Sequence, residues 1–227
     1  RATRIRTVST RIARSLTALG IAAEKVTVLP LPLELDTFLA VGKKRSYGTP
    51  TTHRFVFVGR LALEKNLTVL LQAFADLYKT HKNVSLELVG KGPEHDKLMA
   101  HVAQLGLEQV VKFTPWSEEV ATILAGADTF VLPSRHEGHA IVLLEAMAAG
   151  LPVVTTDVGC VGELVHDSVQ GQVVLPTAPA ITEAMTRYVS DPALHRRHAG
   201  AAYQTAQTIA ARQESYLTEW KVTLMGE

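Results

Sequence analysis

Two glutamates, Glu137 and Glu145, lie eight positions apart in a stretch that joins a short apolar run to a helix-forming run. Eight helical residues rise about 12 Å at 1.5 Å each. That separation is too large for two carboxylates to share one proton or one metal ion, and it suits an extended ligand held at both ends. Free N–H groups at a helix start favour an anion such as a diphosphate between them. The pair therefore predicts a nucleoside diphosphate compound, with Glu145 accepting hydrogen bonds from hydroxyl groups and Glu137 facing the other end.

The elements around the two glutamates would position them. Thr129 to Leu132 is a short apolar run that predicts a buried strand, and Pro133 ends it. We expect a helix from about His139, which Gly150 and Pro152 end. Gly138 leaves room for a ligand to approach the backbone closely at the helix start.

Two cations predict how a leaving diphosphate would be stabilised. Arg60 and Lys65 flank a predicted helix start, directly after the apolar strand Phe55 to Val58. Fixed cations can stabilise the charge that develops on a leaving group without a metal ion. No Asp-x-Asp sequence, a pattern that can hold a metal ion bound to a diphosphate, occurs in the 227 residues, so we expect no metal cofactor.

Other metal or nucleophile patterns are incomplete. The sequence His136-Glu137-Gly138-His139 is too short in spacing for His-Glu-x-x-His. His195 and His198 share one helical face, with no further ligand near them in the sequence. Cys160, the single cysteine, is interpreted as a small packing residue.

From Arg54 onward, strand-like runs alternate with helical patterns, which predicts an α/β fold with a Rossmann-like, doubly wound parallel sheet. Ligands in such sheets bind beyond the carboxyl ends of the strands, where every candidate residue is expected. The predicted strands are 55–58, 84–89, 110–113, 129–132, 152–156 and 172–174. The predicted helices are 67–77, 94–105, 118–124, 161–165, 179–189, 191–204 and 207–221. Residues 40–53 are polar and are expected to form a loop or linker.

Composition indicates a globular domain. The chain is 47% hydrophobic and 20% charged, and its net charge of +1 gives no indication of nucleic-acid binding. A single cysteine favours a reducing compartment, so we expect a cytoplasmic protein. The chain opens at Arg1 rather than at methionine, so a fragment of a longer protein is expected.

The central stretch, Pro-Ser-Arg-x-Glu-Gly-x-x-x-x-x-Leu-Glu-Ala-Met-Ala-x-Gly-x-Pro-Val-Val from Pro133, resembles the nucleotide-sugar site of retaining GT-B glycosyltransferases of family 4 (glycosyl transferases group 1). The resemblance covers about residues 26 to 200. It implies that the chain is the C-terminal, donor-binding half of a GT-B fold. The implied reaction transfers a hexosyl group, with retention, from a nucleoside diphosphate sugar such as a UDP or GDP sugar to a glycan, lipid or other acceptor, as in polysaccharide biosynthesis.

The resemblance also implies roles for residues at matching positions. Arg60 and Lys65, after Gly59, would hold the donor's diphosphate, Glu145 would bind the ribose hydroxyls and Glu137 would contact the transferred sugar. Gly90 and Gly92 match the family's Val-Gly-x-Gly-Pro turn, for which a ligand contact and a plain tight turn are equally good interpretations. The remaining positions are Thr114, near the nucleotide base, and His139, Ala140 and Ile141, whose amides would point at phosphate.

Departures from the family pattern affect the local backbone. Asn66 stands where the family usually has glycine after the lysine; asparagine tolerates the left-handed region and can cap a helix. His139 and Ala140 replace a frequent aromatic-glycine pair, which affects the choice of sugar. Cys160 and Gly162 replace a glycine and a proline.

The resemblance divides the chain into four parts. Residues 1–25 are expected to be a remnant of an N-terminal acceptor domain, 26–53 an interdomain linker, 54–205 the donor domain and 206–227 a helix returning towards the missing domain. Expected partners are the donor, a glycan or lipid-linked acceptor and the N-terminal domain, with peripheral membrane association of the full-length enzyme open. A sugar-nucleotide epimerase or phosphorylase on the same fold, or a non-catalytic nucleotide-binding module, are the alternatives.

Overall fold

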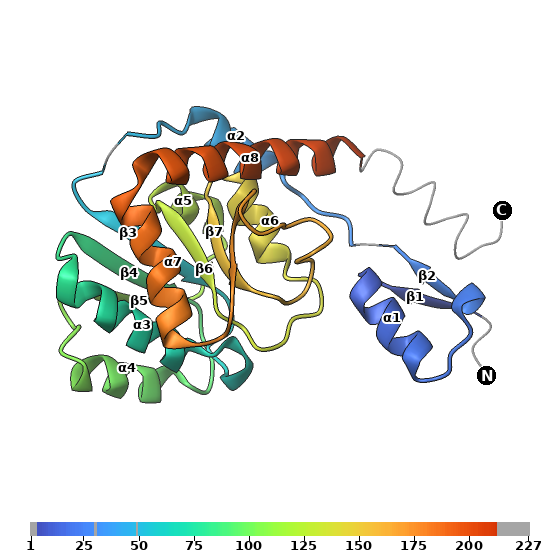
Figure 1. Cartoon of the computed structure of the whole chain (residues 1–227), viewed down its shortest axis with the longest axis horizontal. Helices are drawn as coiled ribbons and strands as arrows, with labels where there is room; N and C mark the ends of the chain where they lie inside the picture. Colours follow the sequence, from blue (N-terminus) through green and yellow to red (C-terminus); the bar gives the residue numbers. More distant parts are fainter. Residues whose placement is uncertain (1–3, 30, 49, 213–227) are drawn as a thin grey trace.

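The computed structural model describes residues 4–29, 31–48 and 50–212, which form a parallel sheet between helices with a small N-terminal unit beside it (Figure 1). The N-terminal unit consists of β1 (Ile5–Thr7), α1 (Thr10–Ala18), the short 3-10 helix η1 (Ala23–Lys25) and β2 (Val26–Val28), with β1 and β2 parallel. Ser9 caps α1, because its hydroxyl accepts a hydrogen bond from the amide of Ile12 at 3.3 Å.

The main sheet has six parallel strands in the order β5-β4-β3-β6-β7-β8. Its strands are β3 (His53–Val58), β4 (Val84–Val89), β5 (Val111–Thr114), β6 (Thr129–Leu132), β7 (Val153–Thr156) and β8 (Gly171–Val174). Counted along the chain, this is the 3-2-1-4-5-6 order of Rossmann sheets, so the predicted fold class is confirmed. The order reverses between β3 and β6, and the crevice beyond the carboxyl ends of these two strands is where such sheets bind ligands.

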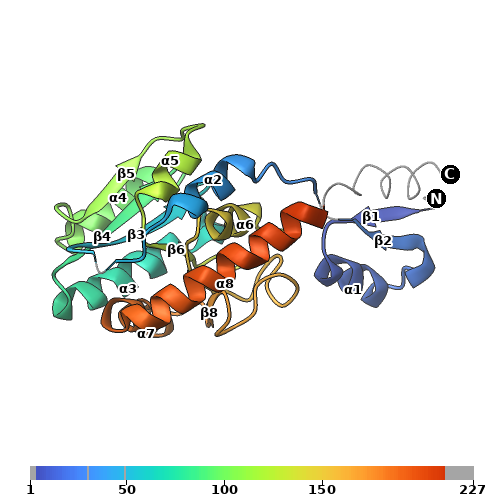
Figure 2. The same ribbon diagram turned by 90° about the horizontal axis from the view of Figure 1, so that it is seen from above.

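Helices cover both faces of this sheet (Figure 2). The helix α3 packs against α4 and α7 on one face, while α2 packs against α5, α6 and α8 on the other. Their bounds are α2 (Asp36–Lys44), α3 (Leu67–Thr80), α4 (His95–Gln104), α5 (Val120–Ala125), α6 (Ile141–Ala148), α7 (Ala178–Ser190) and α8 (Pro192–Ala211), with a 3-10 helix η2 (Leu63–Lys65) before α3. Within the described ranges, no helix combines the length and apolar character that a membrane span needs.

The apolar periodicity of α3 explains why the sequence predicted this helix well. Leu67, Leu70, Leu71, Phe74 and Leu77 follow the helical spacing, and each is at most 2% exposed. They pack under the sheet strands in one continuous core. The buried stripe fixes α3 beneath β3 and β4 and so fixes the turn that carries Arg60 and Lys65.

The predicted loop over residues 40–53 is wrong at both ends. The helix α2 extends to Lys44, and β3 begins at His53. Close packing explains the helix, since a Cβ atom at Gly42 would lie 2.3 Å from the carbonyl oxygen of Ala148 in α6. This small residue lets α2 lie directly on α6, a tertiary contact that the polar sequence of the segment does not reveal.

Two predictions near the C-terminus also fail. The short helix expected at 161–165 is instead an irregular turn, in which Val161 and Val165 form an isolated bridge and Gly162 has a φ of +84°. The expected break after residue 204 is absent, because α8 continues to Ala211. Asp191 caps this helix by accepting hydrogen bonds from the amides of Ala193 and Leu194. The part of the last predicted helix beyond residue 212 lies outside the described residues.

Candidate functional site

Lys65 and Glu137, which are 72 positions apart, meet where β3 and β6 end. The Nζ atom of Lys65 lies 2.6 Å from Oε1 of Glu137, and the two side chains are only 16% and 12% exposed. The hydroxyl of Ser134, which is fully buried, donates to the same carboxylate oxygen at 2.7 Å. The turn after β6 is in turn tied to η2, because the amide of Arg135 donates to the carbonyl of Glu64 at 2.8 Å. A cation and an acid that the sequence placed in separate motifs thus form one buried pair.

The polypeptide between Glu137 and α6 is a strained turn rather than a helix. The helix begins at Ile141, two residues later than expected, so the predicted helical rise between Glu137 and Glu145 does not apply to its first half. Ala140, the residue before α6, has a φ of +60°, a conformation in which a side chain is disfavoured. The backbone of Gly159 packs against it, since a Cβ atom at Gly159 would lie 2.8 Å from that of Ala140. Neighbouring packing therefore holds the amides at the start of α6 in place.

Glu145 lies one turn into α6 and is half-buried among apolar neighbours. Burial raises the pKa of its carboxyl group. Among the described residues no group donates a hydrogen bond to this carboxylate. A half-buried acceptor without a donor is suited to bind hydroxyl groups that a ligand supplies.

Arg60 is exposed at the end of β3, and no hydrogen bond or ion pair of its guanidinium exists within the described residues. It follows Gly59, whose amide donates to the carbonyl of Val89 at 2.9 Å. Gly59 and Arg60 thus lie in the loop beside the crevice between β3 and β6, in the position that the sequence predicted for a diphosphate contact.

Close packing explains why residues 90 and 92 are both glycine. A Cβ atom at Gly90 would lie 1.9 Å from the carbonyl oxygen of Gly59, and one at Gly92 would lie 2.2 Å from that of Leu61. Gly90 also has a φ of +145°. The turn after β4 is therefore packed backbone to backbone on the loop that carries Arg60, which favours the tight-turn interpretation for these two residues.

The part of the predicted site that would contact the nucleotide base lies after β5. The hydroxyl of Thr114 donates to the carboxylate of Glu87, and its carbonyl accepts from the amide of Gly90 at 2.9 Å. Trp116, two residues further on, is 52% exposed. An exposed indole beside the carboxyl edge of the sheet offers a stacking surface.

A contact that the sequence did not predict joins the N-terminal unit to the loop after β7. The guanidinium of Arg11 pairs with Asp157 and donates to the carbonyl of Val161 at 3.2 Å. The amide of Arg11 donates to Glu163 at 3.1 Å. The ion pair is exposed and so contributes little stability by itself. These contacts place the first turn of α1 against the same edge of the sheet, next to a pocket of about 470 Å³.

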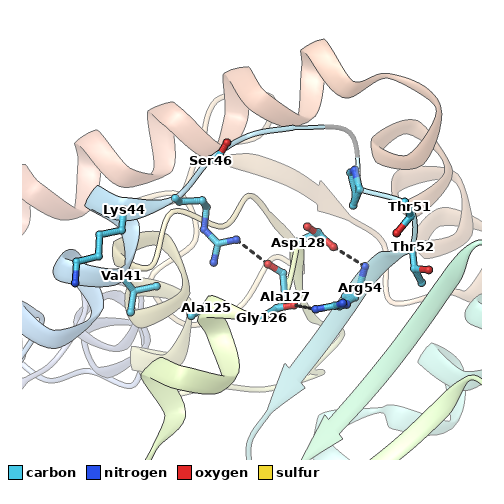
Figure 3. Close-up of a pocket in the computed structure, with 12 residues that line it drawn as sticks. Val41, Lys44, Ser46, Thr51, Thr52, Arg54, Ala125, Gly126, Ala127 and Asp128 are labelled. Carbon is cyan, nitrogen blue, oxygen red and sulfur yellow. Dashed lines mark hydrogen bonds between the residues drawn. The ribbon is translucent and has the colours of Figure 1, made fainter.

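A second pocket of about 470 Å³ lies at the opposite edge, between the end of α2 and the amino end of β3. Three of the charged residues that line it, Arg45, Arg54 and Asp128, are bonded to the protein. The guanidinium of Arg45 donates to the carbonyls of Ala149, Ala127 and Leu124, each at 2.7 Å. Arg54 donates through its amide to Asp128 and through its guanidinium to Gly126 (Figure 3). Arg45, Arg54 and Asp128 are therefore already engaged in structural contacts.

The candidate site is thus drawn from several elements at one edge of the sheet. Lys65 and Glu137 touch, and Gly59 contacts Gly90. Arg60, Glu145 and the start of α6 lie along the same edge, without contacts to that pair. Ser134 and the Arg11 contact were missed by sequence reasoning; Ser134 stood within the quoted motif but carried no signal of its own.

Comparison with known proteins identifies the family. The family described as glycosyl transferases group 1 matches residues 43–205. Alpha-D-kanosaminyltransferase of Streptomyces kanamyceticus is 31% identical over 159 residues, which are 69% of this chain and 41% of that protein. Glycogen synthase of Mycobacterium tuberculosis is 34% identical over 155 residues, 66% of this chain and 37% of that protein. The chain thus spans about two fifths of the length of these relatives.

Solved structures share the fold. The crystal structure of WaaG, a glycosyltransferase involved in lipopolysaccharide biosynthesis, superposes with a TM-score of 0.81 at 22% identity and covers 99% of this chain and 63% of that one. The C-terminal domain of a group 1 glycosyl transferase from Francisella tularensis superposes with a TM-score of 0.65 at 23% identity and covers 79% of this chain and 94% of that one. The chain therefore belongs to the group 1 glycosyl transferases, and its six-stranded sheet is the C-terminal domain of their GT-B fold.

Proposed function

We propose that this chain is the donor-binding domain of a retaining glycosyltransferase, which transfers a hexosyl group from a nucleoside diphosphate sugar to a glycan, lipid or other acceptor. The observation that carries the proposal is the clustering of Lys65, Glu137, Arg60 and the start of α6 at the carboxyl edge where the strand order reverses. Two structural neighbours support it. The Anabaena protein HepE was solved in complex with UDP and glucose, and the pneumococcal GtfA with UDP and GlcNAc.

The diphosphate would lie against the start of α6. The first amides of a helix have no intrahelical partner and attract anions. Arg60 would reach the same phosphates, because its guanidinium is exposed beside the crevice and has no partner in the described residues. These groups supply positive charge for a leaving diphosphate, so the proposed site needs no metal ion.

The Lys65–Glu137 pair would join the leaving group to the transferred sugar. In the unligated site each charge neutralises the other across 2.6 Å, and the hydroxyl of Ser134 fixes the carboxylate. A bound donor would place phosphate next to Lys65 and sugar hydroxyls next to Glu137. The bond between the sugar and the diphosphate, which breaks in the reaction, would then lie between Lys65 and Glu137. These two side chains would already be in position before the substrate binds.

Glu145 would bind the ribose. Its carboxylate has a pKa raised by burial and no hydrogen-bond donor in the described protein. Two ribose hydroxyls would supply those donors and favour the ionised form. Glu145 would gain these hydrogen bonds from a nucleotide but not from free phosphate. It would therefore favour the binding of nucleotides.

The N-terminal unit would belong to a second domain that carries the acceptor. Its two parallel strands form too small a sheet to be stable alone. None of the residues of α1 is fully buried, although the helix is amphipathic. The contacts of Arg11 join this unit to the loop after β7, so an acceptor held there would lie at the same edge of the sheet as the proposed donor site.

Calorimetric titration of this chain with UDP, GDP and ADP tests the proposal. We expect one of the three to bind, and Glu145→Ala to weaken its binding by roughly tenfold to a hundredfold, as expected for lost hydrogen bonds to a charged group. Glu108→Ala, which removes an exposed glutamate at the amino edge of the sheet, is the matched control and should bind normally. Equal binding by the wild type and Glu145→Ala would contradict the role of Glu145, and binding of none would contradict the proposal for this chain.

A further inference from the structure

His139 is buried at the start of the candidate diphosphate site, yet neither of its ring nitrogens has a hydrogen-bond partner. The residue is 6% exposed, and both Nδ1 and Nε2 are without a partner within the described protein. Other buried imidazoles each have one partner: Nε2 of His53 contacts the hydroxyl of Thr129 at 2.9 Å, and Nε2 of His195 the carbonyl of Asp128 at 2.8 Å. Buried polar groups in native proteins are normally paired, so His139 requires an explanation.

The position of His139 indicates what kind of partner is missing. It directly precedes Ala140, the residue from which α6 starts, so its backbone lies at the helix end that attracts anions. Its backbone carbonyl is held by the amide of Cys160 at 3.1 Å. The carbonyl of His139 is therefore satisfied, whereas the imidazole lacks a bond. A histidine also stands here where similar enzymes often have an aromatic residue that cannot donate.

The charged groups around the ring are few. Glu163 and the backbone of Val8 face it, from the loop after β7 and from the N-terminal unit, and the Val8 backbone lies close enough to raise the pKa of the ring without meeting hydrogen-bond geometry. Arg11 is bonded to Glu163 and paired with Asp157, and Glu137 is paired with Lys65. The neighbouring thiol of Cys160 has a pKa raised by burial to about 12, so it remains uncharged near neutral pH. No cation in this set is free to balance an entering phosphate at the His139 end.

We propose that the imidazole of His139 binds the diphosphate of the donor and takes up a proton when a nucleoside diphosphate enters the site. This inference rests on the proposed function, because it assigns a further ligand residue to the same site. Burial lowers the pKa of His139 in the unligated protein, while Glu163 and the Val8 backbone act in the opposite direction. A diphosphate beside the ring would add negative charge and raise that pKa, so the bound form carries an imidazolium.

The sign of the pH dependence follows from this. The pKa of His139 is higher in the complex than in the free protein, so the affinity for nucleotide rises as the pH falls between those two values. One linked proton changes the affinity by at most about tenfold per pH unit. The terminal phosphate of the nucleotide itself titrates near pH 6, so a variant without the imidazole is needed to separate the two sources of protons.

Calorimetry of the whole chain with UDP, GDP and ADP, in two buffers of different ionisation enthalpy at each pH from 6 to 8, measures the protons taken up. His139→Phe is the matched variant, because it keeps an aromatic ring and removes both nitrogens. We expect the wild type to take up more protons than His139→Phe and to bind roughly tenfold more tightly at pH 6. Thermal unfolding checks that the variant is folded, and we expect it to be as stable as the wild type because no hydrogen bond is lost.

A second measurement does not depend on the variant. The imidazole nitrogen resonances of His139 should move to the imidazolium position when the wild-type chain is saturated with nucleotide at pH 7. Nucleotide binding with equal proton uptake in both proteins and an unchanged His139 signal would overturn this inference and leave the donor site intact. Binding of none of the three nucleotides would overturn the proposed function and this inference together.

Discussion

The two edges of the main sheet differ in how their polar groups are satisfied. At the amino edge, Arg45 donates to three carbonyls and His53 contacts Thr129. At the carboxyl edge, His139 has two unpartnered nitrogens and Glu145 has no donor among the described residues.

Three non-glycine residues of the described chain have a positive φ. Asn66 (+56°) and Ala140 (+60°) lie at the carboxyl edge, and Ser168 (+60°) lies in the loop before β8. Groups that a fold leaves unsatisfied or strained tend to mark the place where a ligand completes the structure. The unpartnered groups at the carboxyl edge are those that the proposed ligand would complete, and each prediction below alters one edge while leaving the other intact.

The largest effect on stability is expected at Gly90. Gly138, at the same edge of the sheet, serves as the comparison. Gly90→Ala would drive a Cβ atom to 1.9 Å from the carbonyl of Gly59, at a φ of +145°. We expect a loss of about 4 kcal/mol in the free energy of unfolding, measured by urea denaturation. A Cβ atom at Gly138 would meet nothing within 4 Å, so Gly138→Ala should leave stability within about 0.5 kcal/mol.

Gly138→Ala should nevertheless weaken nucleotide binding, because the added methyl group would occupy space that the donor approaches. Calorimetry of the folded variant measures this effect. Normal binding by Gly138→Ala would show that the open space beside Gly138 is not part of the ligand site.

A smaller effect on stability is expected at the amino edge. Arg45→Met keeps the aliphatic part of the side chain but leaves the carbonyls of Ala149, Ala127 and Leu124 without their donor. We expect a loss of about 2 to 3 kcal/mol in the free energy of unfolding, with nucleotide affinity unchanged at temperatures where the variant is folded. Lys44→Ala, an exposed neighbour, is the control and should change stability little. If Arg45→Met bound nucleotide more weakly while folded, the ligand would contact the amino edge, which would contradict a site at the carboxyl edge.

The smallest effect is expected from an exposed arginine. Arg60→Ala removes no contact within the described protein, so stability should not change. Its nucleotide affinity should fall by about 1.5 to 2 kcal/mol, because one charge-assisted contact to phosphate is lost. Arg54→Ala removes an exposed arginine from the amino edge and should bind nucleotide normally. If both variants bound equally well, Arg60 would not be a diphosphate ligand.

The sequence predicted the parts of the fold that repeat an apolar pattern. The stripe of α3 and the alternation of β4 are visible in the residues themselves, because burial of one face is a local property of the pattern. The helix α2 was missed because its stability comes from Gly42 lying on α6, about a hundred positions further along the chain. No local pattern records such a contact.

The candidate site was predicted by type and position but not by contact. Lys65 and Glu137 were expected near the same diphosphate and sugar, but their direct pairing depends on the crevice between β3 and β6. The start of α6 was misplaced by two residues, because Gly159, which is 19 positions after Ala140, packs against that residue in its left-handed turn. The lack of a partner at the His139 ring could not be predicted, because its surroundings come from the N-terminal unit and the loop after β7.

Hydrogen–deuterium exchange of this chain, with and without the nucleoside diphosphate that binds best, tests the central claim most directly. It reports on both edges of the sheet in one measurement. We predict slower exchange in peptides covering 59–66 and 133–145 on saturation with nucleotide, and no change in peptides covering 44–54 and 124–128. Protection at the amino edge, or none at the carboxyl edge in the presence of bound nucleotide, would contradict the account.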